Sequence, residues 1–370
     1  MFKIIDRYII KKYLGTFSFM LILLSVVVLV IDVQQKIPRI ENAKLIDPKL
    51  DLTYFLIHFY PFWIINLIMT FLSILVFISV IYFTSRMANN TEIVAIISSG
   101  ASFHRFAKPY LLTSLFIACL SLVINHFILP WANIQKNQLE AYTYNARNKE
   151  KVLGTAPVSA QLSRTEYIFV NSWNKAEKRG SGFVFQKFDK NRKMTYELKA
   201  SDVLWDKVKK QFVLNSYFEK TINKDDTEKL GNGVELRKSF GHDPEELFPN
   251  ELLGQNKTTL ELLKFIQREK EKGNSNLNTH LNELHQRTSM PVSIVILTFL
   301  ALSLASQKKR GGLGVNLAIG ISLAFLFVFS FEALKVVSEN KSMSPLLAMW
   351  FPNIVFFPIA LYLYLKRANQ

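Results

Sequence analysis

Six stretches of this chain contain no Asp, Glu, Lys or Arg over a length sufficient to cross a membrane. They cover residues 13–31, 52–85, 109–135, 288–307, 311–331 and 342–365. A helix rises about 1.5 Å per residue, so about 20 apolar residues cross the hydrocarbon core of a bilayer, and all six stretches qualify. Soluble cores also contain apolar helices, but six such stretches in one chain predict a protein with six transmembrane helices.

The first apolar stretch follows Lys3, Arg7, Lys11 and Lys12, as the apolar part of a signal peptide would. Its 19 residues exceed the length of an ordinary signal core, and no small-x-small cleavage site follows it at residues 32–34. We therefore expect this stretch to be retained as the first transmembrane helix.

The distribution of charge predicts the orientation of the six helices. The side that holds both termini carries twelve basic residues against two acidic ones, Asp6 and Glu92, whereas the short loops on the other side are balanced. Cytoplasmic loops carry an excess of Lys and Arg, so both termini are expected in the cytoplasm. Most of the net charge of +16 then comes from basic residues in the cytoplasmic loops and termini of a membrane protein. Nucleic acid is therefore not expected as a partner.

Residues 136–287 form a polar block between the third and fourth apolar stretches, which this topology places outside the cytoplasm. Four segments rich in Val, Ile, Phe, Tyr and Thr are separated by polar turns and predict strands, at residues 165–173, 182–188, 194–203 and 211–222. Short strands at this spacing indicate an antiparallel sandwich or open barrel. Thr258 and Glu261 then form a capping box before an amphipathic helix. The predicted domains are residues 1–135, 136–287 and 288–370.

No catalytic or cofactor-binding motif is present. The chain has no GxxxxGK[ST] phosphate loop, and Gly311, Gly312 and Gly314 are better explained as a tight turn that opens a helix. The six His are dispersed without an HExxH pattern, and Cys119 is the single cysteine. We expect no metal, no cofactor and no enzymatic activity in this chain.

A short apolar helix is predicted at about residues 89–100, between the second and third transmembrane helices. It shows Ile93, Val94, Ile96 and Ile97 behind Glu92, which suits the positive end of a helix, and Gly100 suits its stop. The helix is too short to cross a membrane and too apolar to remain solvated. It either lies on the inner leaflet or docks into a cytoplasmic partner.

Two further sites carry charge where a helix meets the membrane surface. Lys36 and Arg39 follow the first apolar stretch, and spacing alone favours snorkelling of their long side chains over recognition of an anionic lipid head group. Arg287 and Pro291 stand where the fourth transmembrane helix begins, and neither predicts a function.

Together these features resemble the LptF/LptG family of lipopolysaccharide-export permeases. The resemblance includes Asp6-Arg7-Tyr8-Ile9 and the element E-x-V-A-x-x-x-x-G-x-S, which runs here from Glu92 to Ser102. It also includes Leu284-His285-x-Arg287-x-Ser289-x-Pro291 and the order of three helices, β domain and three helices. The features fit LptF-like and LptG-like members alike.

The resemblance implies a fold, partners and site residues. It implies a periplasmic β-jellyroll domain and a subunit of an ABC transporter in the bacterial inner membrane. Its partners would be a dimer of an LptB-like ATPase, a paralogous LptF/LptG subunit and an LptC-like protein, with lipopolysaccharide as the cargo. The short helix would be the coupling helix that enters the ATPase, with Glu92, Ile93, Val94, Ala95 and Gly100 as its site residues. Lys36 lies about where a lysine of LptG-type members faces the lipid, so the resemblance implies that Lys36 contacts the lipid.

Other function classes stay open on the residues alone. The chain could be the membrane subunit of an exporter for another lipid or lipoprotein. It could also be a non-transporting membrane scaffold whose external domain binds a periplasmic protein. Lifting a lipid from a bilayer exposes acyl chains at a cost of roughly 0.8 kcal/mol per CH₂, so an exporter without its own nucleotide site needs an ATPase partner.

Overall fold

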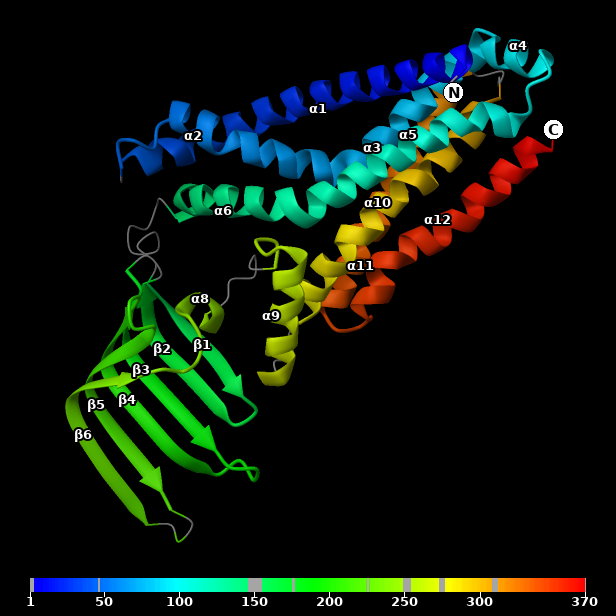
Figure 1. The fold of residues 1–370 in the computed structure, drawn as a ribbon. Coiled ribbons are helices and arrows are strands. Elements are labelled where there is room, and N and C mark those ends of the chain that lie inside the picture. The colour runs from blue at the N-terminus through cyan, green and yellow to red at the C-terminus, as the bar shows by residue number, and fades with distance from the viewer. Residues whose placement is uncertain are drawn as a thin grey trace.

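The computed structural model describes residues 3–45, 47–145, 155–174, 177–223, 225, 227–248, 254–272, 277–307 and 312–369. Within these residues six helices are long and apolar enough to cross a membrane. An antiparallel sheet lies between the third and the fourth of them in the chain (Figure 1). The expected fold class, six transmembrane helices with an inserted antiparallel β domain, is confirmed.

The membrane part is a bundle of long helices. Its elements are Ile4–Lys44 (α1), Tyr60–Asn89 (α3), Phe103–Val123 (α5), the π-helical turn Ile124–Ile128 (η1), Leu129–Asn145 (α6), Asn278–Ala305 (α10), Gly312–Glu339 (α11) and Pro345–Ala368 (α12). Both chain ends and the short helix Glu92–Ser98 (α4) lie at the same end of the bundle (Figure 1). We call this the basic end, after Lys3, Arg105, Lys108, Lys366 and Arg367.

Prolines shape two of the apolar stretches. The second stretch, 34 residues in the sequence, divides into Leu52–His58 (α2) and α3, which has Pro61 in its first turn. Asp51 caps α2 by accepting a hydrogen bond from the amide of Tyr54 at 2.8 Å. In the third stretch η1 stands directly before Pro130, which has no amide to donate to the preceding turn. The wider π turn lets the helix continue into α6.

The interior of the bundle is centred on α10. Its residues Ile294, Leu297 and Leu300 are almost fully buried in the largest apolar cluster. In contrast, α1 is buried only near its two ends, by Asp6, Ile9 and Tyr13 at one and by Lys36, Ile40 and Ala43 at the other. The apolar middle of α1 therefore lies on the surface of the bundle, where lipid or another membrane protein would cover it.

The β domain is one antiparallel sheet of six strands in chain order. The strands are Thr155–Ser163 (β1), Glu166–Asn174 (β2), Arg179–Phe188 (β3), Met194–Asp206 (β4), Gln211–Ile222 (β5) and Glu228–Lys238 (β6). The four strands expected from the sequence correspond to β2 to β5. The jellyroll implied by the family resemblance needs Greek-key crossovers, and the described strands instead form a meander. Short hairpin turns between successive strands favour this order.

The two strands that the sequence did not predict, β1 and β6, are the edges of the sheet. Edge strands lack a neighbour on one side, so they tolerate residues of weak strand propensity. In β6 a Cβ added at Gly233 would lie 2.6 Å from Cε1 of Tyr217, so the Tyr217 ring of β5 crosses the glycine backbone. A close approach of this kind selects glycine despite its low strand propensity.

One face of the sheet is packed. Residues on that face alternate along the strands, and Trp173, Phe183 and Phe212 are almost fully buried there. The segment after β6 returns over this face through Phe240, the short helix Pro244–Leu247 (α8) and Phe248, whose ring lies 5.2 Å from that of Trp173. The β domain therefore has an aromatic interior covered by its own chain.

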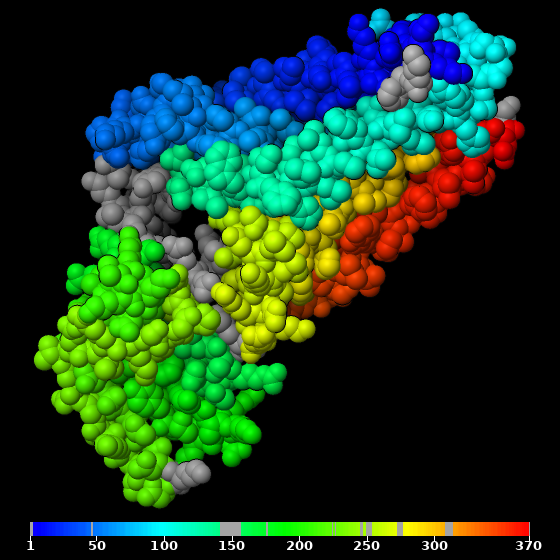
Figure 2. Space-filling view, viewed as in Figure 1, coloured from blue at the N-terminus to red at the C-terminus, as the bar shows by residue number. Residues whose placement is uncertain are grey.

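Helix Thr259–Lys272 (α9) connects the β domain to the bundle. One half of the expected capping box is present, since the Thr258 amide donates to the Glu261 carboxylate at 2.8 Å. The Thr258 hydroxyl donates to the same carboxylate oxygen at 2.8 Å. In the space-filling view the yellow-green surface of α9 lies between the green β domain and the cyan and orange helices (Figure 2). The β domain is thus attached at the opposite end of the bundle from the basic end (Figure 1).

Candidate functional site

Helix α4 is a short apolar helix that lies at the basic end of the bundle. It begins after Thr91, whose φ of 62° reverses the chain, and it ends before Gly100, whose φ of 89° favours glycine. Ile93 is 1% exposed and anchors α4 in the main core of the bundle. Val94 is 58% exposed and Ala95 is exposed beside it, so these two residues form an outward apolar face.

The Glu92 carboxylate is held by α1. Tyr8 donates its hydroxyl to Oε2 at 2.7 Å, and the Lys12 ammonium lies 3.1 Å from Oε2 and 3.3 Å from Oε1. The side-chain amide of Asn90 donates to Oε1 at 3.2 Å, and the Lys12 ammonium also lies 4.4 Å from the centre of the Tyr8 ring. Both carboxylate oxygens are therefore engaged within the chain.

These contacts shift the titration of Glu92. Burial alone would raise its pKa, but hydrogen bonds from Tyr8, Asn90 and Lys12 outweigh the burial and hold the pKa below the ordinary value of 4.5. The charged form of Glu92 is therefore favoured at neutral pH. The side chain is 26% exposed, so part of it still faces solvent.

A second pair ties α1 to the beginning of α5. The Arg105 guanidinium donates to both oxygens of Asp6, at 2.6 Å and 2.7 Å. This parallel arrangement fits the planar fork of arginine to a carboxylate. Asp6 and Glu92 are the two acidic residues on the side of the sequence that holds both termini, and each is paired with a base from another helix.

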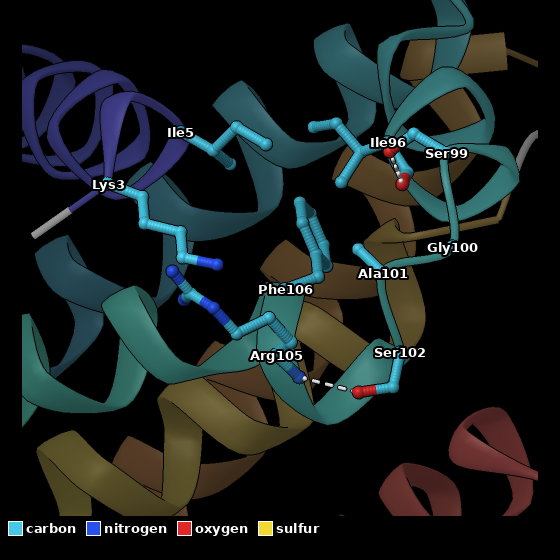
Figure 3. Close-up of a pocket in the computed structure, with 9 residues that line it drawn as sticks. All are labelled: Lys3, Ile5, Ile96, Ser99, Gly100, Ala101, Ser102, Arg105 and Phe106. Carbon is cyan, nitrogen blue, oxygen red and sulfur yellow. Dashed lines mark hydrogen bonds between the residues drawn. The ribbon is translucent and has the colours of Figure 1, made fainter.

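A hollow of about 480 Å³ lies beside Arg105, between the start of α1 and the loop that follows α4. Lys3 and Arg105 point toward one another on one side of it, and Gly100, Ala101 and Ser102 form the opposite wall (Figure 3). Ser102 accepts a hydrogen bond from the Arg105 amide at 3.2 Å and so caps α5. Ile5, Ile96 and Phe106 complete an apolar lining. The hollow could receive a side chain from a docked protein.

Lys36 and Arg39, the residues considered for lipid binding, lie at the other end of α1. Lys36 is 7% exposed, with its ammonium 3.1 Å from Asp32 and 3.7 Å from Glu140 of α6. The same ammonium stands 4.5 Å from the centre of the Phe59 ring. Arg39 is exposed. Lys36 therefore does not snorkel to solvent but connects α1, the junction of α2 and α3 at Phe59, and α6.

The structure adds Tyr8 and Lys12 to the residues that the sequence suggested. Tyr8 belongs to the segment Asp6-Arg7-Tyr8-Ile9, which the sequence marked without a role, and its partner Glu92 belongs to the other marked segment. The signal in the sequence was the two isolated carboxylates among twelve bases. An isolated carboxylate among many basic residues is expected to form an ion pair with one of them. Spacing along the chain does not show which lysine or arginine lies close enough to do so.

Comparison with known families gives one match. The family described as "Lipopolysaccharide export system permease LptF/LptG" matches residues 7–366, nearly the whole chain. No curated protein matches the chain at the level required for a relative.

Proposed function

The chain belongs to the LptF/LptG family of lipopolysaccharide export system permeases, and we propose that it is the membrane subunit of an ATP-driven lipopolysaccharide exporter. The family is one of membrane permeases rather than of enzymes. The exporter would lie in the bacterial inner membrane, with the basic end in the cytoplasm and the β domain in the periplasm. The positive-inside rule supports this orientation.

The observation that carries the proposal is the outward face of α4. Val94 and Ala95 are exposed at the basic end, and the hollow beside them has Lys3 and Arg105 on one wall. An apolar helix at a basic membrane surface suits insertion into a groove of a cytoplasmic protein with an acidic rim. We assign this surface to an LptB-like ATPase dimer. In this assignment Ile93 anchors the coupling helix, Glu92 orients it and Gly100 ends it.

The transport step requires an outlet for the acyl chains. The position of the β domain, at the end of the bundle opposite the basic end, supports a role in receiving them on the way to an LptC-like protein and the periplasmic bridge (Figure 1). The apolar middle of α1, exposed along the bundle, supports a paralogous LptF/LptG subunit and the lipid itself as its neighbours. We propose that Lys36 and Arg39 contact the anionic head group of the lipid. The Lys36 ammonium would leave the carboxylates of Asp32 and Glu140 to bind the head group.

Co-purification tests the coupling role of α4. The complex is purified through this chain, and the co-eluting ATPase is quantified for wild type, Val94→Asp and Val208→Asp. Val208 is 92% exposed in the β domain and serves as the matched control for the same substitution. We expect Val94→Asp to lose most of the ATPase and Val208→Asp to keep it. Equal ATPase in all three preparations would contradict the docking role.

Photo-crosslinking tests the cargo. A photoreactive residue replaces Leu236, which packs against the interior of the β domain, and a second preparation carries it at Val208. The proposal predicts an ATP-dependent adduct with lipopolysaccharide at Leu236 only. An exporter of another lipid or lipoprotein would give a different adduct, and a scaffold would give none that depends on ATP.

A further inference from the structure

We propose that the start of α9 is a membrane-surface site, with Leu260 and Leu263 inserted among the lipids of the leaflet on the side of the β domain and Lys264 bound to their phosphates. The partner is a lipid bilayer that contains anionic phospholipid. This inference goes beyond the proposed function, because it concerns neither the ATPase nor the cargo. It gives the β domain, which α9 connects to the bundle, a second attachment to the membrane besides the transmembrane helices.

Two neighbouring helices define the level of α9 relative to the membrane. The Thr259 hydroxyl, in the first turn of α9, contacts His126 of η1 and Arg287 of α10. Residues 288–307, directly after Arg287, carry no charge and as a helix cover about 30 Å, the thickness of a hydrocarbon core. Arg287 therefore marks one boundary of that core, and α9 begins at this boundary.

The surface of the bundle beside this contact is one that lipid would cover. Phe127 and Ile128, directly after His126, are exposed, and so is Trp131. Tryptophan is enriched where membrane proteins meet the head groups. The exposed apolar surface of η1 and α6 therefore reaches the level at which α9 begins.

The first half of α9 carries apolar residues on two faces. Leu262 and Phe265 are buried and pack against Leu281 of α10. Leu260 and Leu263, three positions apart and so on a common face, are 72% and 46% exposed. A helix that only packs against the bundle needs the first face but not the second. The second face is therefore available to the membrane beside it.

The exposed face of α9 changes in character along the helix. Leu260 is followed on this face by Lys264, Gln267 and Glu271, all exposed, at helical steps of three or four residues. Gln267 donates to Glu271 at 3.1 Å, which places these two side by side. The face is thus apolar in the first turn, basic in the second and polar beyond it. This order fits a helix that leaves the membrane through its head groups, where a lysine places its aliphatic part among lipids and its ammonium on phosphate.

The depth of single spin labels in a bilayer tests the proposal. One label replaces, in turn, Leu260, Leu263, Gln267 or the exposed Val208 of the β domain, in the full chain carrying Cys119→Ser. The protein is placed in liposomes of phosphatidylethanolamine and phosphatidylglycerol. Collisions of each label with oxygen, which concentrates in lipid, are compared with collisions with a nickel chelate, which stays in the water on both sides. The ratio of oxygen to nickel collisions should be severalfold higher at positions 260 and 263 than at 267 and 208.

Two other results would overturn the proposal. Nickel collisions at positions 260 and 263 as frequent as those at 208 would place this face of α9 in water. Rare collisions with both reagents would mean that protein covers the face, so that a second subunit and not lipid is its partner.

Charge reversal tests the contact between Lys264 and the phosphates. With the label at Leu263, Lys264→Glu should lower the ratio of oxygen to nickel collisions in liposomes that contain phosphatidylglycerol. The decrease should be smaller when phosphatidylcholine replaces phosphatidylglycerol. Lys270→Glu makes the same change at an exposed lysine about 9 Å further along the helix and should have little effect. An equal decrease in both lipid mixtures would contradict binding of Lys264 to anionic head groups.

Discussion

The side chains of His126 and Arg287 meet at the hydroxyl of Thr259, with Nδ1 of His126 at 2.5 Å and Nη1 of Arg287 at 3.1 Å. A guanidinium can only donate, so the Thr259 oxygen accepts from Arg287 and its own proton is free to bond Nδ1 of His126. This hydroxyl, in the first turn of α9, therefore joins α9 to η1 and α10. This contact attaches α9 to the bundle together with an apolar cluster in which Leu262 and Phe265 of α9 pack against Leu281 of α10.

Arg287 is expected to be the most costly residue to replace at this junction. It is 3% exposed and donates to Glu283 at 3.0 Å, to Thr259 and to the carbonyl of Gly254. Arg287→Met leaves the Glu283 charge without its partner, and breaking a buried pair costs about 3–5 kcal/mol. Thermal unfolding in detergent should show the loss. Adding Glu283→Met should recover part of it, and no recovery would mean that the ion pair is not the cause.

Lys36 and Arg39 should differ in what their replacement changes. Lys36→Met removes the buried ammonium that Asp32 and Glu140 share and leaves these carboxylates with Tyr60 and Lys136 as partners, so the melting temperature should fall. Arg39→Met, on the exposed surface, should change stability by no more than about 0.5 kcal/mol. If Lys36→Met instead left the melting temperature unchanged and reduced only lipid binding, the internal network would not be what holds Lys36.

The pair between Asp6 and Arg105 should stabilise the basic end. Asp6→Asn keeps the size of the side chain but removes the charge that the guanidinium binds, so the melting temperature should fall. Arg7→Gln, which alters the charge of the exposed next residue, is the control and should have little effect. A fall of equal size in both variants would indicate a general effect of charge rather than loss of this pair.

The contacts that hold Glu92 of α4 against Tyr8 and Lys12 of α1 should weaken in acid. The pKa of Glu92 lies below 4.5 in the folded chain, so the carboxylate binds protons less readily there than in the unfolded chain. The stabilisation is therefore complete above pH 4.5 and is lost as the pH falls through the lowered pKa. Spin labels can replace Arg7 of α1 and Ser98 of α4, both exposed, in a chain that also carries Cys119→Ser. The distribution of distances between the two labels should broaden over that pH range. In the Glu92→Gln variant the distribution of distances should already be broad at neutral pH and should not change as the pH falls.

Much of the fold follows from local patterns in the sequence. The charge-free stretches predicted all six transmembrane helices, because an unpaired charge at the centre of a bilayer is costly and such stretches are otherwise rare. Segments rich in Val, Ile, Phe, Tyr and Thr, separated by polar turns, predicted the four strands β2 to β5. The edge strands β1 and β6 escaped prediction because an edge tolerates glycine, as at Gly233, and because their partners are fixed only by the assembled sheet.

In the functional site, too, some features followed from the sequence and others only from the tertiary structure. The sequence by itself determined that a short apolar helix with one carboxylate lies at the basic end, and that Lys36 and Arg39 lie near the far end of the first span. Only the tertiary structure decided that Glu92 faces Tyr8 and Lys12 and that Lys36 faces Glu140. Such pairs join residues distant in the chain, so they depend on how each helix is rotated and packed. Hydropathy fixes which segments cross the membrane, but packing fixes which charges meet.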